Sequence, residues 1–298
     1  MTLTVLIAGA SGFLGTHLGR ELTDRGHDLV ALVRRPATSP SESTWDPYAG
    51  VYDRGVVERA DVVVNLAGAP TIGNPHSGRW ARELRESRVT TTRVLATAIA
   101  GSERKPAFVA GNAIAWYGDH GEQVVTEESP SVGDSLLTQV SREWQDAAEP
   151  AAAAGARLCV LRTAPVMDRR GAPLKQLRLL TRLGLGARLG DGRQRMAMIS
   201  LRDWVGGVAH LIEHEAAAGP FNLCCPQTPT NAEFTQALAR ATHRKAVLVA
   251  PRFAIRAAAG RLAPEALGSI NLRPAALEEA GYRFRDRTVD DVLRAGLT

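Results

Sequence analysis

The sequence predicts an α/β protein: a doubly wound parallel-sheet Rossmann fold with a smaller C-terminal, mostly helical domain on the substrate side. Three observations predict it. Short apolar runs alternate with helix-like stretches as far as Arg162, the glycine-rich segment GASGFLG follows the first of these runs, and the pattern changes after Arg162. With 298 residues, 45% of them hydrophobic, the chain can bury a full core.

Five apolar runs in the first part are predicted strands of one parallel sheet, because they are apolar on both faces. They are LTVLIA (3–8), DLVALVR (28–34), DVVVNLAG (61–68), AFVAGNA (107–113) and RLCVLRT (157–163). Helix-like stretches between them cover about 12–25, 79–100 and 135–154. This alternation predicts βαβ units with right-handed crossovers.

The later part of the chain predicts a second, partly interleaved domain. Residues 168–195 are rich in glycine and arginine, and 196–214 read as a strand and helix that return to the sheet. PFNLCC (220–225) is a plausible last strand, and 230–241 a helix capped by Thr230 or Asn231. We therefore predict a dinucleotide-binding domain at 1–162, joined by 196–225, and a smaller domain at 163–195 and 226–298.

Composition narrows the classes of partner. The net charge of +5 comes almost entirely from arginine, and aromatic residues make up only 5%, so we expect no nucleic-acid partner. No run of about 18 apolar residues could span a membrane, so we expect a soluble, cytoplasmic protein with no membrane partner. Cys159, Cys224 and Cys225 have no metal-ligand spacing and are expected to be buried thiols, with no metal bound. The oligomeric state is left open, with a homodimer among the alternatives.

GASGFLG has the glycine spacing and the strand–loop–helix context of a dinucleotide-binding loop. Gly9 suits the tight turn, Gly12 the approach of the backbone to a pyrophosphate, and Gly15 close packing of helix on strand. Ser11 and the amides around Phe13 and Leu14 could donate to phosphate oxygens.

The end of the second predicted strand indicates the nucleotide. NAD-specific folds place an acidic residue here, whereas LVALVRR ends in Arg34 and Arg35. Two guanidinium groups suit a 2′-phosphate, so we expect NADP(H) as the cofactor. The alternative is that both are solvated surface arginines.

The strand DVVVNLAG ends in small residues that would let the adenosine side of the cofactor lie against the backbone. These are Leu66, Ala67 and Gly68. The alternative is a plain buried strand followed by a glycine turn.

Several motifs occur in one order along almost the whole chain. They are GASGFLG, NLAG (65–68), AWYG (115–118), LRTAPV (161–166), GLGARLGDGRQ (184–194) and ISLRDWV (199–205). Together they resemble the extended short-chain dehydrogenases/reductases, and most closely the YfcH-type, nucleoside-diphosphate-sugar epimerase-like subfamily of the NAD(P)-dependent epimerases/dehydratases. The resemblance implies a Rossmann domain that binds NADP(H), with a cleft against the C-terminal domain. It also implies that Arg88 faces the cofactor and that Val166 lies near the nicotinamide. The alternative for Arg88 is one more exposed arginine on a charge-rich helix.

The catalytic pattern of the family is absent from this chain. Extended members use a serine and a Tyr–Lys pair four residues apart, but Ala113, Leu137 and Ser141 stand at those positions, and no YxxxK occurs anywhere. Tyr117, predicted at the mouth of the strand AFVAGNA, is one candidate proton donor, and its alternative is a structural aromatic.

Asn112 is the second candidate, because its amide could hydrogen-bond a substrate carbonyl; its alternative is to tie down the loop. Asp119 and His120 are the nearest titratable pair and could equally be turn residues. A bound water is a further alternative source of the proton.

Residues 169–195 hold eight basic residues against one acid, Asp191. Lys175, Arg178 and Arg182 have helical spacing that puts them on one face, which favours an anionic small-molecule substrate or, alternatively, a solvated basic face. Asp203 is expected to fix a loop to the sheet.

Two classes of function remain open from the sequence. The first is an NADP(H)-dependent oxidoreductase or epimerase acting on a carbonyl or sugar-like substrate, nucleotide-linked substrates included. The second is a non-catalytic NADP(H)-binding sensor or interaction protein. The missing Tyr–Lys pair favours the second class, and the retained substrate domain favours the first.

Overall fold

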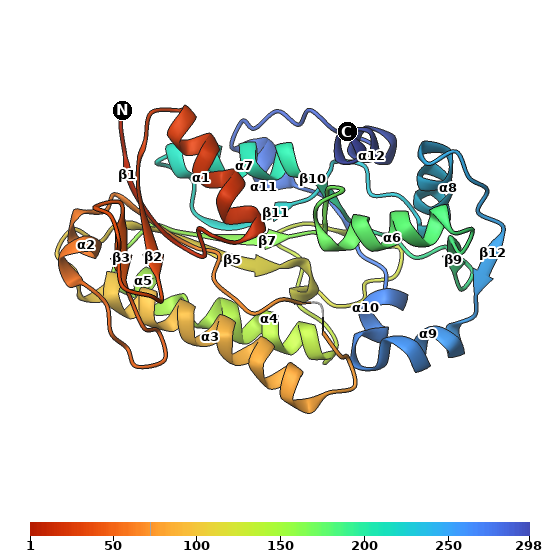
Figure 1. Ribbon diagram of the computed structural model, residues 1–298, viewed down its shortest axis with the longest axis horizontal. Coiled ribbons are helices and arrows are strands. Elements are labelled where there is room, and N and C mark those ends of the chain that lie inside the picture. The colour runs from red at the N-terminus through yellow and green to blue at the C-terminus, as the bar shows by residue number, and fades with distance from the viewer. Residues whose placement is uncertain (72) are drawn as a thin grey trace.

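A seven-stranded parallel sheet forms the centre of the structure, a computed structural model that describes residues 1–71 and 73–298 (Figure 1). Its strands are, in spatial order, β11 (Gly219–Leu223), β7 (Leu158–Thr163), β5 (Ala107–Ala113), β4 (Val62–Asn65), β1 (Thr4–Ala8), β2 (Asp28–Val33) and β3 (Glu42–Thr44). All six pairings between neighbours are parallel. The doubly wound sheet predicted from the sequence is confirmed, and β3 is an additional short edge strand.

Alternate residues of each strand serve two separate cores. In β1, Val5 and Ile7 pack on one face, against α1 (Phe13–Asp24) and α7 (Leu201–Glu213). Leu6 and Ala8 pack on the other face, against α3 (Gly78–Gly101) and α5 (Glu149–Ala153). α2 (Arg54–Arg59) and α4 (Leu136–Asp146) lie on the same side as α3 (Figure 1). Burial on both faces explains why the strands are apolar throughout rather than alternating.

Side-chain caps fix where several helices begin. Ser77, Ser135 and Ser200 accept from the backbone amides three residues later at the starts of α3, α4 and α7. Thr230, one of the two caps that the sequence left open, forms a reciprocal capping box with Glu233 at the start of α8 (Asn231–Ala241). The prediction of one helical stretch over 135–154 is wrong, since α4 ends at Asp146 and α5 begins at Glu149. Pro150 has no amide hydrogen and therefore cannot continue the helical hydrogen bonds of α4.

Three two-stranded parallel pairs complete the described elements. β8 (Val166–Met167) pairs with β10 (Ile199–Ser200), β9 (Ala187–Leu189) with β12 (Leu248–Ala250), and β6 (Val124–Val125) with β13 (Asn271–Leu272). The strand expected to return to the large sheet before α7 is therefore β10, which pairs with β8 instead. Only β11 returns to that sheet, beside β7.

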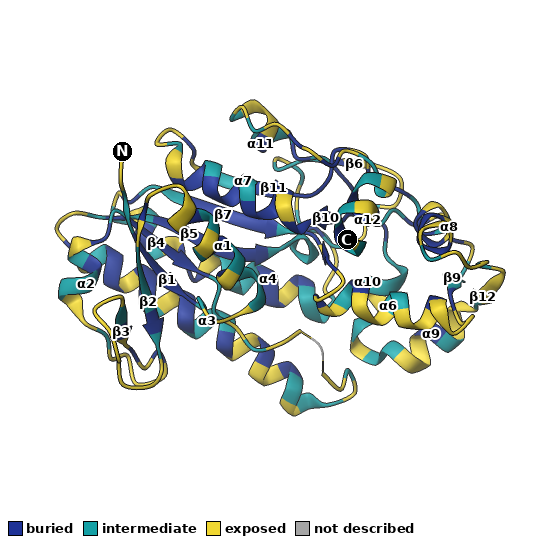
Figure 2. Cartoon of the chain, turned by 45° about the horizontal axis from the view of Figure 1, so that its top comes forward, coloured by how far each residue is buried: buried dark blue, intermediate teal, exposed yellow. Residues whose placement is uncertain are grey.

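The remaining elements are mostly helical and gather around the C-terminal half of the chain. They are η1 (Ile114–Trp116), α6 (Ala172–Arg182), α9 (Arg252–Ala259), η2 (Gly260–Leu262), α10 (Ala263–Leu267), α11 (Ala275–Glu279) and α12 (Val289–Leu297). A separate apolar core joins α6, α8 and α12 through Leu174, Phe234 and Leu293. Figure 2 shows the buried strands enclosed by half-exposed helices, with exposed residues concentrated on α6 and α9.

Two composition-based expectations can be compared with the structure. Cys159, Cys224 and Cys225 are buried free thiols, as expected. Within residues 1–71 and 73–298, no helix combines the length and the apolar character that a membrane crossing requires.

Candidate functional site

The predicted site residues lie along one edge of the central sheet, where the parallel strands end. Gly9 follows β1, Arg34 follows β2 and Leu66 follows β4. Asn112 is near the end of β5, and Val166 comes shortly after β7. Since the strands are parallel, their carboxyl ends meet at the same edge, which is where ligands bind in open α/β sheets.

The loop between β1 and α1 accepts only glycine at two positions. Gly9 has φ +84°, and a Cβ there would lie 2.7 Å from the carbonyl carbon of Leu66. A Cβ on Gly15 would lie 2.2 Å from the carbonyl oxygen of Gly9. These distances are shorter than any side chain tolerates, so the glycines bring the loop, the helix and the end of β4 into direct backbone contact.

The first turn of α1 offers backbone amides at this edge. Gly12 is the N-cap residue, and no side chain caps the helix. The amides of Phe13, Leu14 and Gly15 have no acceptor inside the helix, as in the first turn of any α-helix. Ser11 and Gly12 are exposed beside them. Uncapped amides and the helix dipole together suit a phosphate group.

The segment after β4 is held against this loop by α3. The side chain of Asn65 donates to Oγ1 of Thr92 at 2.8 Å and accepts from the amide of Ala67 at 3.1 Å. Residues 66–68 consequently lie beside the glycine loop, with the backbone of Leu66 against Gly9. Leu66, Ala67 and Gly68 are therefore brought to the edge where the sequence predicted them.

Arg88 reaches from α3 into the same segment. Its Nη1 donates to the carbonyl oxygens of Ala69 at 3.0 Å and Leu84 at 3.1 Å, and its Nη2 donates to Oγ1 of Thr71 at 3.1 Å. The guanidinium carbon lies 5.1 Å from the centre of the Trp144 ring. Arg88 is thus an ordered residue of this edge and not a solvated arginine of the helix surface.

The charge of Arg88 has no carboxylate partner among the described residues, although the side chain is half-buried. Burial lowers the pKa of Arg88 to about 10, so the group is still charged at neutral pH. Its Cγ would lie 3.4 Å from a Cβ placed on Gly68. A desolvated cation without a counter-charge is unfavourable by itself, and a bound anion would offset that cost.

Arg34 and Arg35 differ in the structure, although the sequence treated them alike. Arg35 forms a bidentate pair with Glu42, at 2.8 Å from Nη1 and 2.5 Å from Nη2. Its hydrogen bonds lower the pKa of Glu42 to about 2. Arg34 is exposed and has no ion pair among the described residues. Arg35 therefore already has an acidic partner, and Arg34 is the more available of the two for a phosphate.

Val166 lies in β8, buried and paired with Ile199. It belongs to the core that α7 and the large sheet share. Its contact with a nicotinamide stays a prediction.

Tyr117 follows β5 and η1, as the sequence placed it, but its hydroxyl is not free to act as a proton donor, which corrects the candidate role. Its side chain is fully buried, its hydroxyl donates to Oδ1 of Asn222 at 2.7 Å, and it accepts from Nη1 of Arg162 at 2.8 Å. Burial raises the pKa of Tyr117 to about 12. A hydroxyl that is enclosed and bonded on both sides cannot meet a substrate, so Tyr117 has a structural role in this arrangement.

Asn112 also has a structural role, and a row of polar residues across the sheet explains it. Asn112, Arg162 and Asn222 are register partners on β5, β7 and β11. The amide of Asn112 donates to the carbonyl oxygen of Ser141 at 3.1 Å and accepts from the amide of Ala113 at 2.7 Å. It thus ties β5 to α4, a structural role, although the alternative that the sequence left open was to tie down the loop.

Sequence reasoning missed Arg162, which is 2% exposed and stacks 3.5 Å from the centre of the Trp116 ring. A signal for it was present. The penultimate residues of three otherwise apolar strands, Asn112, Arg162 and Asn222, are all polar.

The first turns of α4 carry the positions where the family has its tyrosine and lysine. Leu137 is half-buried and Ser141 is buried, with its carbonyl oxygen bound by Asn112. Neither side chain can act as the usual acid–base pair. Ala113, at the serine position, ends β5.

Glu265, which sequence reasoning also missed, reaches from α10 to the start of α4. Its Oε1 accepts from Oγ of Ser135 at 2.7 Å and from the amide of Leu137 at 3.3 Å. Its Oε2 is buried with no hydrogen-bond partner among the described residues. A carboxyl group therefore contacts the turn on which the family's tyrosine would stand. No local signal could have shown this, since Glu265 and Leu137 are 128 residues apart in sequence.

The other titratable candidates hold loops in place. Asp119 accepts from the amides of Gly121 at 3.0 Å and Ser269 at 3.1 Å, and the ring of His120 lies 3.1 Å from the carbonyl oxygen of Pro130. Asp203 is fully buried and accepts from the amides of 285 and 286 and from the hydroxyl of Tyr282. Asp203 has a structural role, but it fixes the C-terminal segment onto α7 and not a loop onto the sheet, which was the expectation from the sequence.

The basic stretch 169–195 divides into paired and unpaired residues. Arg170 pairs with Asp168 at 2.8 Å, and Arg193 lies 3.6 Å from Glu122. Lys175, Arg178 and Arg182 lie on α6, as predicted, and form no ion pair among the described residues. α6 begins beside the glycine loop, because a Cβ on Gly171 would lie 3.4 Å from the ring of Phe13.

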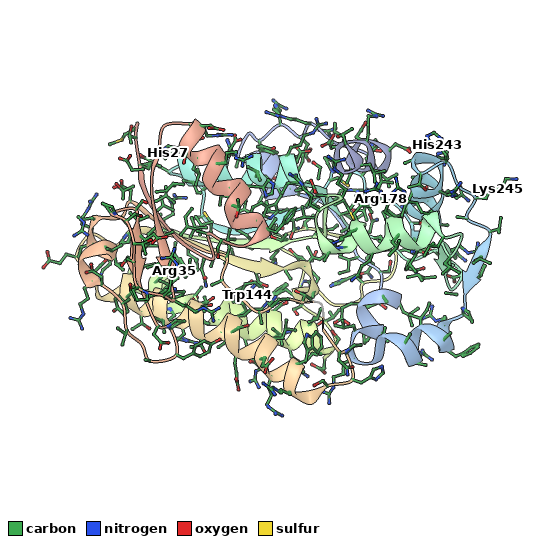
Figure 3. The ribbon with its side chains drawn as sticks, in the orientation of Figure 1. His27, Arg35, Trp144, Arg178, His243 and Lys245 are labelled. Carbon is green, nitrogen blue, oxygen red and sulfur yellow. The ribbon has the colours of Figure 1, made fainter. Side chains whose placement is uncertain are left out.

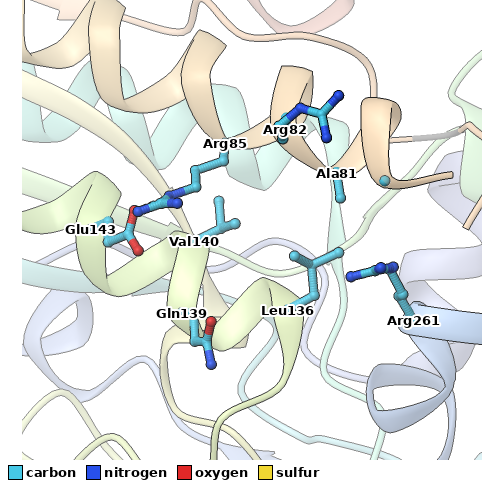
Figure 4. A pocket seen from close by; sticks show the side chains of 9 residues that line it. Ala81, Arg82, Arg85, Leu136, Gln139, Val140, Glu143 and Arg261 are labelled. Atoms are coloured by element: carbon cyan, nitrogen blue, oxygen red, sulfur yellow. The ribbon is translucent and has the colours of Figure 1, made fainter.

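A pocket of about 270 Å³ lies between α3, α4 and η2 (Figure 4). Leu136, Arg261 and the ion-paired Arg85 and Glu143 line it. It contains none of the predicted cofactor or catalytic residues, so it is not the cofactor site.

The edge as a whole fits a dinucleotide phosphate. Gly9 and Gly15 leave room for a backbone cradle, the first turn of α1 offers amides, and Arg88 offers a charge without a counter-charge. Among the described residues, the family's Tyr–Lys pair is missing from this edge, because Leu137 and Ser141 stand at those positions. Cofactor binding is therefore better supported by the geometry than any particular acid–base step.

Comparison with known proteins agrees with this geometry. Residues 5–224 match the NAD dependent epimerase/dehydratase family, and residues 250–295 match a domain of unknown function, DUF1731. An epimerase family protein of Mycobacterium leprae is 39% identical over 296 residues, which cover 99% of this chain and 95% of the relative.

Two solved structures are similar over 99% of this chain. The human epimerase family protein SDR39U1, solved with NADPH, has a TM-score of 0.87 at 28% identity, and the match covers 99% of the human chain. A nucleoside-diphosphate sugar epimerase from Corynebacterium glutamicum has a TM-score of 0.81 at 31% identity, with 58% of that chain covered. These matches confirm the resemblance to the extended short-chain dehydrogenases/reductases, and the chain belongs to the NAD dependent epimerase/dehydratase family.

Proposed function

We propose that the protein binds NADPH at the carboxyl edge of its central sheet and uses it in an oxidoreductase or epimerase reaction on a carbonyl or sugar-like substrate. The observation that carries the cofactor assignment is Arg88, a half-buried cation with no carboxylate partner among the described residues, which lies against Gly68 and Ala69 after β4. The human relative solved with NADPH supports the same cofactor.

The choice of NADPH over NADH rests on Arg34. No acidic residue ends β2, and Arg34 is exposed without an ion pair, whereas Arg35 is held by Glu42. A charge-assisted hydrogen bond to a 2′-phosphate contributes roughly 1.5–3 kcal/mol, equivalent to about tenfold or more in affinity.

The cofactor supplies hydride chemistry, and the chain must supply orientation and a proton route. Tyr117 and Asn112 are buried in structural hydrogen bonds, so we assign the proton to neither. Glu265 is the replacement that we propose, because its carboxyl group contacts the turn of α4 on which the family's tyrosine would stand and its Oε2, unlike the polar atoms of Tyr117 and Asn112, has no hydrogen-bond partner among the described residues. Lys175 and Arg178, on the helix that begins beside the glycine loop, support an anionic substrate such as a nucleotide-linked sugar.

The second function is a non-catalytic NADPH-binding sensor or interaction protein. The burial of Tyr117 and Asn112, together with Leu137 and Ser141 at the tyrosine and lysine positions, favours it. Both proposals place NADPH at the same site. They differ in whether the protein then converts a substrate.

The test begins with fluorescence titrations of NADPH and NADH. Arg34→Ala should lose at least about tenfold in NADPH affinity and little in NADH affinity. Arg20→Ala, at an exposed arginine of α1, is the matched control. An unchanged preference in Arg34→Ala would refute the assignment of the 2′-phosphate to Arg34.

Turnover is tested by following NADPH oxidation with a panel of carbonyl compounds and nucleotide-linked sugars. Glu265→Gln should lower kcat, while Ser135→Ala disturbs the same helix start and keeps the carboxyl group. Tight NADPH binding with no turnover across the panel would favour the sensor. Equal losses in the two variants would assign Glu265 a structural role only.

A further inference from the structure

One end of the molecule carries a surface that neither the fold nor the cofactor site requires. It consists of residues 172–189 and 243–256, which form α6, β9, β12 and α9, and we call it the basic apolar end. Figure 1 shows these four elements together at the end opposite β3 and α2.

Large apolar side chains are exposed here and rarely elsewhere. Of the twelve such side chains that are exposed among the described residues, eight belong to this end, with exposed fractions of 43–78%. They are Leu179, Leu180, Leu183, Leu185, Val247, Leu248, Val249 and Phe253. Such a concentration is unusual for a surface that meets only water.

The charges of this end all have one sign. The two segments contain eight basic residues and no aspartate or glutamate: Lys175, Arg178, Arg182, Arg188, Arg244, Lys245, Arg252 and Arg256. None of the eight forms an ion pair with a described carboxylate, whereas arginines elsewhere in the chain, such as Arg25, Arg202 and Arg240, do. Figure 3 labels Arg178 and Lys245 at this end.

The two segments form a single surface. β9 and β12 pair in register from Ala187 with Leu248 to Leu189 with Ala250. Nε of Arg244 donates to the carbonyl oxygen of Arg182 at 3.3 Å. The exposed apolar and basic side chains are therefore neighbours in space, although about 60 residues separate them in sequence (62 from Arg182 to Arg244).

The apolar side chains on the outer face of α6 pack against no core of the described residues, unlike Leu174 on its inner face. Leu174 and Thr181 are buried on the inner face of this helix. Leu179 and Leu183 lie four residues apart on the opposite face, at 58% and 65% exposure. The helix therefore has an apolar inner stripe for the fold and a second apolar stripe, flanked by cations, that the fold leaves uncovered.

We propose that the basic apolar end docks on the surface of a membrane that contains anionic phospholipid. Leucine, valine and phenylalanine side chains would enter the headgroup boundary, and the flanking lysines and arginines would contact the lipid phosphates. The expectation of no membrane partner rested on the lack of a spanning segment, and docking at the surface needs none.

Charge complementarity favours this occupant over two others. A second copy of the chain in a two-fold contact would bring the same cations against one another. Nucleic acid would leave eight exposed apolar side chains against phosphates, and the end offers a single aromatic residue, Phe253, for base stacking. An acidic protein surface is the occupant that the experiment must separate from the membrane.

The experiment is flotation of the full-length protein with vesicles of phosphatidylcholine alone and of an equimolar mixture with phosphatidylserine. The protein should bind the mixed vesicles and not the neutral ones, and binding should weaken as salt is raised. If mixed vesicles bind no more protein than neutral vesicles at low salt, the proposal is overturned and an acidic protein becomes the occupant to test.

Two paired variants separate the two contributions. Arg244→Gln with Lys245→Gln should weaken binding about tenfold or more. Leu183→Gln with Phe253→Gln should also weaken binding, without changing its dependence on salt. Tyr48→Gln with Val51→Gln, two exposed apolar residues near the other end, should bind like the wild type.

NADPH titration of each variant checks that the fold and the cofactor site are retained, so this proposal can fail while the proposed function stands. Equal vesicle binding by all three variants would also overturn it.

Discussion

The hydroxyl of Tyr117 donates to Oδ1 of Asn222 at 2.7 Å, across a gap of 105 residues in sequence. Arg162, the register partner of Asn222, donates to the same hydroxyl at 2.8 Å. This arrangement makes Tyr117 the centre of a buried hydrogen-bonded network that joins two strands, β7 and β11, to the segment after β5. A residue that looked like a proton donor in the sequence is a stabilising contact of the fold.

The first prediction concerns this network. Tyr117→Phe should lower the free energy of unfolding by about 1–3 kcal/mol, because it removes the hydrogen-bond partner of Asn222 Oδ1 and one of the acceptors of Arg162 inside the core. NADPH affinity and any turnover, measured per folded molecule, should be retained. Chemical denaturation and NADPH titration measure the two effects. Loss of turnover at unchanged stability would instead restore Tyr117 as the acid.

The second prediction compares two glycines with the same backbone conformation. Gly9 and Gly26 both have φ +84°, but a Cβ on Gly26 meets nothing within 4 Å, whereas a Cβ on Gly9 meets the backbone of Leu66 at 2.7 Å. Gly26→Ala should cost only the strain of a left-handed alanine, about 1–2 kcal/mol. Gly9→Ala should cost more and also abolish NADPH binding. Thermal unfolding and NADPH titration of both variants measure these effects. Equal losses of stability and of NADPH affinity in the two variants would contradict the prediction.

The third prediction separates cofactor binding from stability at Arg88. Arg88→Met should weaken NADPH binding by about tenfold or more, since one charge-assisted hydrogen bond contributes roughly 1.5–3 kcal/mol. The unliganded protein should lose some stability, because the variant removes the hydrogen bonds to Ala69, Leu84 and Thr71. The loss is limited, since it also removes a half-buried charge that has no counter-charge among the described residues. Arg82→Met, on the exposed side of the same helix, is the control for both measurements. A large loss of stability with unchanged affinity would make Arg88 purely structural.

The fourth prediction is a pH dependence. The hydrogen bonds from Arg35 lower the pKa of Glu42 to about 2 in the folded protein, from an ordinary value of 4.5. Because the folded-state pKa is the lower one, the stability contributed by Glu42 is fully present above pH 4.5 and is lost as pH falls through about 2. NMR titration of the Glu42 carboxyl group measures this directly, and Arg35→Gln should return the midpoint towards 4.5. A midpoint near 4.5 in the wild type would show that the pair does not persist in solution.

The fifth prediction follows from the same pair. Glu42→Gln releases Arg35, which then becomes available beside Arg34 at the end of β2. The ratio of NADPH to NADH affinity should rise, with the change confined to NADPH. Parallel titrations of the two cofactors test this, and an unchanged ratio would mean that Arg35 cannot reach the 2′-phosphate.

The parts of this protein that depend on short stretches of chain were predictable from the sequence. The apolar runs predicted six strands of the central sheet, and GASGFLG predicted the backbone turn at Gly9 and the close contact at Gly15, because both depend on neighbours only a few residues away. The capping box of α8 was equally local. The missing Tyr–Lys pair was also visible, since its spacing is one helical turn.

The rest depended on contacts between distant segments, and only the tertiary structure decided it. The sequence could not show that Asn222 and Arg162 enclose Tyr117, that Glu42 pairs with Arg35 and not Arg34, or that Glu265 reaches the start of α4 from 128 residues away. Hydrogen bonds and burial depend on which side chains meet in space. The sequence does not distinguish an exposed tyrosine from a buried, hydrogen-bonded one. The sequence by itself therefore determined the fold and the cofactor loop, whereas the packing of distant strands and helices determined which polar residues remain available for chemistry.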